Sequence, residues 1–247
     1  MEKQIITRTG DIDAMFKAGA HYGFARSRRH PSTAPFVFGV KNRTEIIDLE
    51  KTAISLAKAS SFVAELAQAG KQVLIVGSKN EARDAVTKVA GTIDMPFVAG
   101  RWLGGTITNF VEIKKRIAKF EGLLVEREKG ELAKYTKKER LLIDRQIAKL
   151  DRFFSGLVPM RQLPGALIVI DSNKEHIAVA EAVRAGIPVV ALSSTDCDIK
   201  KVQYPIVAND SSSASIAYFL NELAKAYKEG VKLQSKKEAT PEIKKVV

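Results

Sequence analysis

Short runs of apolar, β-branched residues, each followed by a stretch with helical periodicity, recur along the chain and restrict its fold more than any other feature. The clearest runs are 72–76, 166–170, 188–192 and 204–208, with a shorter one at 96–99. Such runs are typical of strands buried on both faces of a parallel sheet. Because strands alternate with helices, we expect an α/β fold with a doubly wound, five-stranded parallel sheet of the flavodoxin-like type. The sequence does not give the order of the strands.

The boundaries of the helices are predicted from capping residues and glycines. Apolar side chains at alternating steps of four and three place one helix at 49–67, with Asp48 as its N-cap. Capping boxes at 78–81 and 172–175 predict the first turns of two further helices, and 216–227 is a final amphipathic helix. The glycines expected to end these helices are Gly70, Gly91, Gly186 and Gly230.

The segment 106–155 interrupts the alternation with two long amphipathic helices. Their apolar positions are Ile113, Ile117, Phe120 and Leu124 in the first helix, and Ile143, Ile147, Leu150 and Phe154 in the second. A turn at 129–136 separates them, and 136–139 spells a capping box. The pattern predicts two helices packed antiparallel along one apolar seam, as a coiled-coil hairpin inserted into the α/β domain.

The charge of the chain favours a polyanionic partner. There are 40 Lys and Arg against 28 Asp and Glu, which gives a formal net charge of +12 and a pI near 9.7. Nucleic acid is the commonest partner of such a protein. Residues 112–152 hold 13 basic and 8 acidic side chains, a difference of +5. This hairpin charge has two interpretations that stay open: a solvated helix face, or a rod that reaches phosphates.

Basic residues also gather near the N-terminus, at about 19–48. Residues 36–40 and 44–47 flank a short turn and predict a β-hairpin, and no acidic residue lies between positions 26 and 43. The basic residues of this segment are candidate phosphate contacts, with one histidine beside them: Arg26, Arg28, Arg29, His30, Lys41 and Arg43.

The length of 247 residues is enough for one large domain or two small ones. We assign 1–105 and 156–230 to the α/β domain, 106–155 to the hairpin, and 231–247 to a Lys-rich tail expected to be flexible. No apolar run reaches the roughly 18–20 residues that cross a bilayer, and no signal peptide is recognised. Cys197 is the only cysteine, so no intramolecular disulfide is possible. A cytoplasmic protein is expected.

The loops after the predicted strands give no support to catalysis. There is no G-x-G-x-x-G and no G-x-x-x-x-G-K-[ST] sequence, and the lone Gly77 is what a tight strand-to-helix turn needs. A phosphoacceptor domain would need acidic residues after its first strand to hold magnesium, and 78–80 is Ser-Lys-Asn. We predict no catalytic residue, no cofactor and no small-molecule substrate.

The residues that bind metals show no recognisable spacing. The histidines are far apart in sequence, at His21, His30 and His176. Four aspartates fall near predicted strand ends, where such residues either surround a cation or cap turns, namely Asp171, Asp196, Asp198 and Asp210. We predict no metal site.

The loop 101–106, Arg-Trp-Leu-Gly-Gly-Thr, holds the only tryptophan of the chain. Trp102 is expected to wedge the base of the hairpin against the sheet, while Arg101 contacts phosphate. The two glycines let the backbone approach a ligand closely, and the following helix start favours anions. Five residues of this region join the candidate RNA-binding set: Arg101, Trp102, Lys114, Lys115 and Arg116.

Ordered motifs over about residues 5–230 resemble the bacterial ribosomal protein S2 family of the small (30S) ribosomal subunit. They include Gly-Ala-His-Tyr-Gly at 19–23, Pro-Phe-Val-Phe-Gly at 35–39, Arg-Trp-Leu-Gly-Gly-Thr-Ile-Thr-Asn at 101–109 and Pro-Gly-Ala-Leu-Ile-Val-Ile-Asp at 164–171. Further matches are 46–52, 136–139, 186–189 and 204–206.

The resemblance implies a structural protein rather than an enzyme. It implies a five-stranded α/β domain with a coiled-coil insertion, bound to 16S ribosomal RNA on the solvent side of the 30S subunit, near the head–body junction. It also implies contacts with neighbouring small-subunit proteins, which in many bacteria include ribosomal protein S1, a protein that helps to recruit messenger RNA.

The sequence departs from the family pattern in three places. Phe24 stands where the family usually has His, Arg29-His30 stand where it has Trp-Asn, and 194–199 replaces a D-T-N-x-D-P loop. A family-level polar or metal site at these positions is therefore not carried over, and the added charge implies altered RNA contacts. The alternatives are a small-molecule enzyme or receiver on the same fold, and a nucleic-acid chaperone outside the ribosome. Sedimentation with 30S particles discriminates between them.

Overall fold

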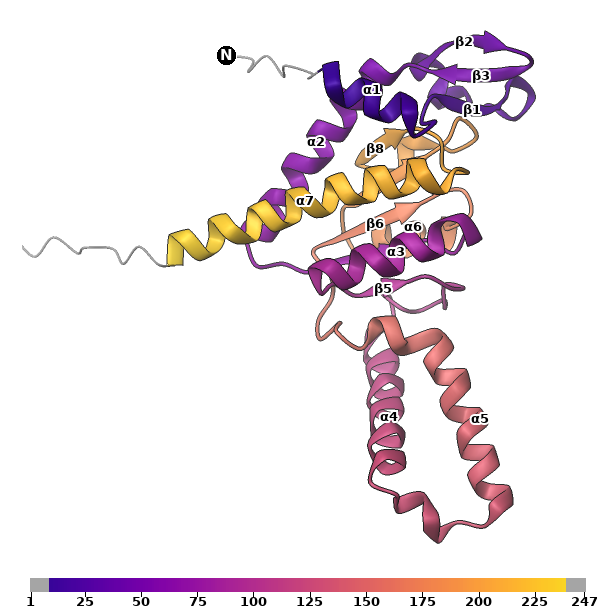
Figure 1. Ribbon diagram of the computed structural model, residues 1–247, viewed down its shortest axis with the longest axis vertical. Helices are drawn as coiled ribbons and strands as arrows, with labels where there is room; N and C mark the ends of the chain where they lie inside the picture. Colours follow the sequence, from indigo (N-terminus) through magenta and orange to yellow (C-terminus); the bar gives the residue numbers. More distant parts are fainter. Residues whose placement is uncertain (1–8, 239–247) are drawn as a thin grey trace, which may run out of the picture.

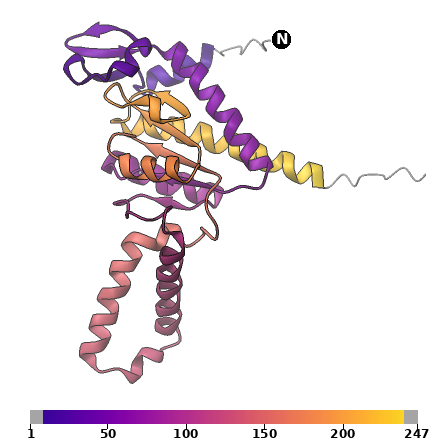
Figure 2. The same ribbon diagram turned by 180° about the vertical axis from the view of Figure 1, so that it is seen from behind.

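The structure, a computed structural model, describes residues 9–238 and has two parts. A layered body carries the large sheet, and a long helical hairpin projects from one end of it (Figure 1). At the other end lies a small N-terminal sheet, and the view from behind shows the same arrangement (Figure 2). The hairpin and the N-terminal sheet, which hold most of the predicted contact residues, therefore lie at opposite ends of the molecule.

The central sheet is parallel throughout, with the strand order β5-β4-β6-β7-β8. Its strands are β4 (Val73–Val76), β5 (Phe97–Val98), β6 (Ala166–Ile170), β7 (Val189–Ser193) and β8 (Tyr204–Val207). All residues of β4, β6 and β7 are buried, as their uninterrupted apolar runs predict. The α/β fold class with a five-stranded parallel sheet is confirmed.

Alternate residues of these strands point into two cores, one on each face of the sheet. The helices of the body are α1 (Thr9–Lys17), α2 (Leu49–Gln68), α3 (Asn80–Ile93), α6 (His176–Arg184) and α7 (Ser213–Glu238). Helices α2, α3 and α7 cover Ile75 and Ile168 on one face. Helix α6 and the base of the hairpin cover Val76 and Val169 on the other. The base of the hairpin is therefore packed into the second core, in addition to being joined to the body through the chain.

A second sheet, antiparallel with the order β1-β3-β2, forms the N-terminal end. Its strands are β1 (Tyr22–Ala25), β2 (Val37–Lys41) and β3 (Thr44–Ile47), and two short 3₁₀ helices, η1 (Arg26–Arg28) and η2 (Pro31–Phe36), lie between β1 and β2. Strands β2 and β3 are the predicted β-hairpin, and its turn residues Asn42 and Arg43 have φ of 50° and 65°. Two adjacent positive φ angles are what a two-residue type I′ turn requires.

The projecting hairpin consists of α4 (Phe110–Glu128), the 3₁₀ helix η3 (Glu131–Lys134) and α5 (Lys137–Phe154). Thr136 and Glu139 form the predicted capping box, each side chain bonding to the other residue's backbone N–H. The buried residues of the two long helices are five of the eight predicted seam positions: Ile113, Ile117, Phe120, Ile147 and Phe154. The two antiparallel helices are confirmed, and their coiled-coil packing stays a prediction.

Two of the four glycines predicted to end helices do not do so. Helix α3 runs past Gly91 and ends at Asp94, which takes the left-handed conformation itself with φ of 51°. Gly230 lies inside α7, which continues to Glu238. A Cβ at Gly230 would collide with the Ala64 carbonyl oxygen, so this glycine allows a close crossing of α7 over α2. The predicted tail therefore begins as helix, and residues 239–247 lie outside the described residues.

Two predicted capping boxes, at 78–81 and 172–175, are also wrong. The N-cap of α3 is Lys79, without a side-chain cap bond. The hydroxyl of Ser78 instead donates to the Glu175 carboxylate across the ends of two neighbouring strands. Asp171 takes the capping role before α6, accepting from the N–H groups of Asn173 and Lys174. The competing partners are far away in sequence, which is why local spacing misassigned them.

Candidate nucleic-acid interface

The N-terminal basic segment presents two unpaired arginines. Arg26 and Arg28 are exposed at the two ends of η1. The guanidinium of Arg28 lies 5.8 Å from the centre of the Phe24 ring, which restrains it over an aromatic face. Neither side chain has a carboxylate partner among residues 9–238. Both are therefore free to bind phosphate.

The next two residues of the segment are engaged within the protein. Arg29 lies 3.3 Å from Glu45, whose side chain is fully buried. The ring Nδ1 of His30 accepts from the Ser32 N–H and lies 2.8 Å from the Ser32 hydroxyl, so it caps η2. Both residues were predicted as RNA contacts, and the structure gives each a role in holding the segment together.

The turn of the N-terminal β-hairpin carries a second pair of free cations. Lys41 and Arg43 are exposed on either side of Asn42. Within the described chain neither forms an ion pair. Because the turn is a two-residue connection fixed by the register of β2 and β3, it holds both side chains at the outer tip of the small sheet.

The loop between β5 and α4 is built around one carboxylate. Glu181 of α6 accepts from the Trp102 indole N–H at 3.2 Å, from the backbone N–H groups of Gly105, Ile107 and Thr108, and from the Thr108 hydroxyl. Burial opposes the ionisation of Glu181, but these hydrogen bonds outweigh it and lower its pKa. The glycine-rich loop thus binds an anion, as predicted for such a loop, but the anion belongs to the protein.

Trp102 is therefore a supporting residue of the interface. Its side chain is 6% exposed and packs at the base of the hairpin, in the core that also contains Ile107 and Phe154. Arg101, the preceding residue, is exposed. The structure thus keeps Arg101 available to a ligand and places Trp102, the wedge that the sequence predicted, behind it.

The three predicted contacts on α4 differ in their surroundings. Lys114 approaches the Arg161 carbonyl oxygen at 3.4 Å, and Lys115 pairs with Glu112 one turn away at 2.6 Å. Arg116 instead lines a groove of about 820 Å³ between α4 and α5, together with Arg145 and Lys149. Arg145 and Lys149 are not among the contact residues predicted from the sequence, although their spacing of four on α5 places them on one helical face.

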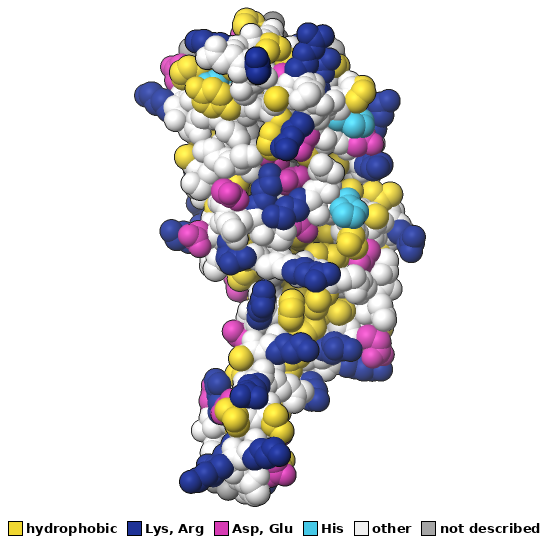
Figure 3. Space-filling view, turned by 90° about the vertical axis from the view of Figure 1, so that its right-hand side faces the viewer, with side chains coloured by type: hydrophobic (Ala, Val, Ile, Leu, Met, Phe, Trp, Pro, Cys, Tyr) yellow, Lys and Arg dark blue, Asp and Glu magenta, His cyan; other side chains and the backbone are white. Residues whose placement is uncertain are grey.

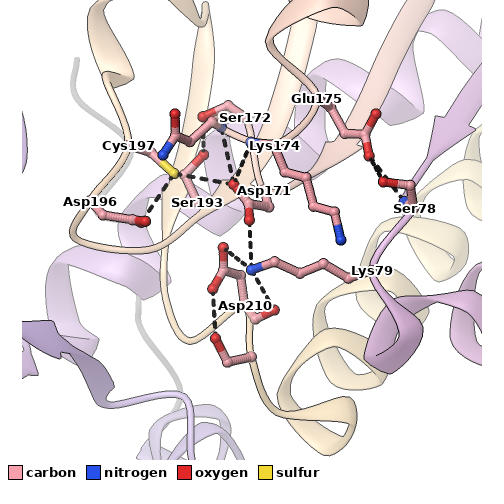
Figure 4. A network of polar contacts seen from close by, with 12 residues as sticks. Ser78, Lys79, Asp171, Ser172, Lys174, Glu175, Ser193, Asp196, Cys197 and Asp210 are labelled. Carbon is pink, nitrogen blue, oxygen red and sulfur yellow. Dashed lines mark hydrogen bonds and ion pairs between the residues drawn. The ribbon is translucent and has the colours of Figure 1, made fainter. Parts of the chain in front are cut away.

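The carboxyl ends of the large strands hold a closed ion network (Figure 4). The ammonium of Lys79 lies 2.6 Å from Asp171 and 3.0 Å from Asp210. Burial lowers the pKa of Lys79, but the two carboxylates outweigh it and raise the pKa, so Lys79 stays charged. Burial raises the pKa of Asp210 to about 6 and that of Cys197 to about 12.

This network leaves little scope for chemistry. Asp171, Asp210 and Cys197 lie close enough to hold a cation, with ligand atoms within 4.8 Å of one another. The ammonium of Lys79 already supplies a positive charge to both carboxylates. A thiol with a pKa of about 12 is protonated at neutral pH and is not a nucleophile. The place where an α/β enzyme would have its site is thus filled by internal ion pairs.

Figure 3 shows the side of the molecule at which the strands of the five-stranded sheet have their carboxyl ends. Lys and Arg side chains are spread over it from the N-terminal sheet to the tip of the hairpin, and Asp and Glu are fewer. In the described part of the chain, no helix is both long enough and apolar enough to span a membrane.

The fold and this surface define a class of protein: a basic α/β protein with a projecting helical hairpin and no catalytic constellation among its described residues. The family model of ribosomal protein S2 matches residues 15–230, and the chain belongs to this family. The family is structural, so the chain is not an enzyme.

Similar proteins carry one name. The chain is 39% identical over 229 residues to "Small ribosomal subunit protein uS2" of Chloroflexus aurantiacus, covering 93% of this chain and 96% of the relative. It is 42% identical to the protein of that name from Roseiflexus castenholzii, over 90% of this chain and 85% of the relative. The corresponding protein of a Nitratiruptor species is also 42% identical, over 89% and 82%.

Proposed function

We propose that the chain is a structural constituent of the small ribosomal subunit that binds 16S ribosomal RNA and acts in translation in the cytoplasm. The relatives that match this chain over most of their length carry the name of a small-subunit protein. One structural observation supports RNA binding most directly: four exposed cations of the N-terminal end, Arg26, Arg28, Lys41 and Arg43, have no carboxylate partner among residues 9–238. Cations without internal partners are available to bind phosphates, and contacts to phosphates position a protein on RNA. Folded RNA is recognised mostly through its backbone and shape.

The proposed contact set is narrower than charge alone would give. The set also includes Arg101, in the loop that leads into the hairpin, and Arg116, in the groove between α4 and α5. Lys114 and Lys115 are less favoured because each already has a protein partner. Arg29, His30 and Trp102 support the interface from within: Arg29 pairs with Glu45, His30 caps η2 through Ser32, and Trp102 donates to Glu181.

Charge reversal tests this proposal. The double variant Arg26→Glu/Arg28→Glu should leave the fold intact and reduce the fraction of protein that sediments with 30S particles in a sucrose gradient. Its matched control is Lys88→Glu/Lys228→Glu, two exposed lysines on α3 and α7. Equal incorporation of both variants would remove the N-terminal segment from the RNA interface. Wild-type protein that stays at the top of the gradient would overturn the proposed function itself.

We also propose that the N-terminal end contacts neighbouring ribosomal proteins, ribosomal protein S1 among them. Large apolar side chains are exposed there, with Phe38 81% and Phe16 60% accessible and Tyr22 beside them. Exposed aromatic residues that gather in one place are typical of protein interfaces. The variant Phe38→Ser should lower the amount of S1 that is retained on purified small subunits, without lowering its own incorporation.

A further inference from the structure

A concave surface at the neck of the molecule, where the hairpin leaves the sheet, is lined by three arginines from three different elements. We call it the neck hollow and define it by Arg83 of α3, Arg101 of the loop after β5, Arg152 of α5, and the backbone of Gly100 and Gly156. Its volume is about 500 Å³, within the range of ligand pockets, roughly 300–1,000 Å³. The hollow is also lined by Phe97 and Val98 of the edge strand β5 and by Thr87 of α3, two elements that lie next to each other (Figure 1).

None of these three arginines has a counter-charge among the residues that the structure describes. Arg83 donates from Nε to the Ala99 carbonyl oxygen at 3.2 Å, which orients the guanidinium and leaves its two terminal NH₂ groups without a partner in the described chain. Arg152 lies 5.7 Å from the centre of the Phe153 ring and forms no ion pair within the described part of the chain. Arg101 has no hydrogen bond or ion pair among residues 9–238. The described residues that line the hollow include no carboxylate.

Three guanidinium groups around one concavity repel one another, and an anion between them removes that repulsion. Arginine suits phosphate in particular because its planar fork donates two parallel hydrogen bonds to oxyanions. Gly100 leaves backbone of the hollow without a side chain, and a Cβ there would meet only the Arg152 carbonyl oxygen at 3.7 Å. Gly156 is needed for packing, because a Cβ there would collide with a backbone carbonyl oxygen of β5. The contrast with Arg29, which the chain neutralises with Glu45, shows that arginine pairing is available in this fold and is not used at the neck.

We propose that the neck hollow binds a phosphate group of the RNA backbone and thereby fixes the hairpin relative to the sheet. Arg101 lies in the connection that enters the hairpin, and Arg152 lies in the last turn of α5, next to the connection that leaves it. A phosphate held between them therefore ties the two ends of the hairpin together at the body. The inference rests on the proposed function, because ribosomal RNA supplies the phosphate. A free phosphate ion presents the same oxygen atoms, and the experiment separates the two sources.

The first experiment observes the hollow in the free, full-length protein. Inorganic phosphate is titrated into ¹⁵N-labelled protein at constant ionic strength, with chloride as the comparison anion, and the Nε–Hε signals of the arginines are followed. We expect the signals of Arg83 and Arg152 to shift together and saturably, with a smaller shift for Arg140 at the hairpin tip. Equal shifts at all three positions would overturn the hollow as an anion site.

The second experiment measures binding to a 16S ribosomal RNA transcript over a series of salt concentrations. The variant Arg83→Gln/Arg152→Gln should bind roughly tenfold more weakly. The slope of log affinity against log salt is negative, and its magnitude should decrease by about 1, because the variant neutralises one phosphate fewer. The control, Lys88→Gln/Arg140→Gln, removes one cation from each of the same two helices outside the hollow, and should bind within about twofold of wild type.

The outcomes separate the two proposals. If the wild-type protein binds the 16S transcript no better than an unrelated RNA of equal length, the proposed function fails, while the phosphate titration still decides whether the hollow holds an anion. If wild type binds and the hollow variant matches its control in affinity and salt slope, the neck contact is overturned and the proposed function stands. If inorganic phosphate saturates the hollow but the RNA affinities match, a free ion and not RNA is the ligand.

Discussion

Replacing Glu181 by Gln should detach the loop at the base of the hairpin. The carboxylate accepts two hydrogen bonds on Oε1, from Trp102 and Gly105, and three on Oε2, from Ile107 and Thr108. A glutamine side chain keeps one acceptor oxygen and turns an NH₂ group towards the remaining donors, so two or three of the five bonds no longer form. Hydrogen bonds to a charged group contribute about 1.5–3 kcal/mol each and are not additive. We therefore expect unfolding to require about 3–5 kcal/mol less.

The assay uses the only tryptophan of the chain, which is itself one of the donors. Urea unfolding of the Glu181→Gln variant is followed by Trp102 emission and by far-ultraviolet circular dichroism, with emission expected to shift to longer wavelength before the body unfolds. The control is Glu112→Gln, which removes an exposed ion pair that contributes about 0–1 kcal/mol. A loss below about 1 kcal/mol, with unchanged emission in native conditions, would refute the role assigned to Glu181.

Three further predictions are measured by urea unfolding, and the first has Gly122→Ala in the hairpin as its control. Gly230→Ala should destabilise by about 1–3 kcal/mol, because the new Cβ meets the backbone of α2. Gly122→Ala, in the open middle of α4, should be neutral or stabilise by up to about 1 kcal/mol. Arg29→Gln should cost about 2–3 kcal/mol by leaving Glu45 buried without its cation, and Arg29→Gln/Glu45→Gln should recover most of the loss. Burial raises the pKa of Asp210 from 3.8 to about 6, so the folded state favours the protonated side chain. The resulting stabilisation of the fold is complete below about pH 4 and is lost as the pH rises through 6. Wild type should lose up to about 3 kcal/mol over this interval, and Asp210→Asn should show a flatter profile.

The large sheet was predictable because its signal lies within each segment. The central strands are uninterrupted apolar runs, and only burial on both faces explains such runs. Strand β1 was missed because its four residues, Tyr-Gly-Phe-Ala, are too few and too mixed to show a period. Its strand geometry comes from pairing with β3, a partner some twenty residues away. Order within the sheet is a tertiary property of the same kind.

Helix ends failed where a side chain had a more distant use. Ser78 and Glu175 each occupy a position in a local capping pattern, yet they bond to each other across two strand ends. Gly230 looks like a helix stop because glycine is the usual residue there, whereas its small size serves the crossing with α2. Spacing along the chain identifies residues that fit a cap and cannot rank them against partners brought close by folding.

The candidate interface shows the same limit for charge. Sequence gives the number of basic residues near each other and not which of them are neutralised. Arg26, Arg28 and Arg29 are almost consecutive, but only Arg29 meets a buried carboxylate, Glu45, supplied by the neighbouring strand β3. Arg83 and Arg152 are 69 positions apart, and no sequence pattern links them, although both line the neck hollow. The fold thus pairs some of the predicted contact residues internally and brings together basic residues that are far apart in sequence.

The sequence departs from the family pattern at Phe24, at Arg29-His30 and at 194–199, and the first two places contact the third. The backbone N–H of Phe24 donates to the Thr195 hydroxyl at 3.0 Å, and that of His30 to the Thr195 carbonyl oxygen at 2.8 Å. Thr33 donates its hydroxyl to the same carbonyl, and Gly23 approaches Thr195 so closely that a Cβ would stand 2.7 Å from its methyl group. Substitutions at 24–30 and 194–199 therefore form one changed contact. Because this contact holds both ends of η1, it fixes Arg26 and Arg28 against the body, and a change in RNA contacts at the N-terminal end would arise from that altered support as well as from added charge.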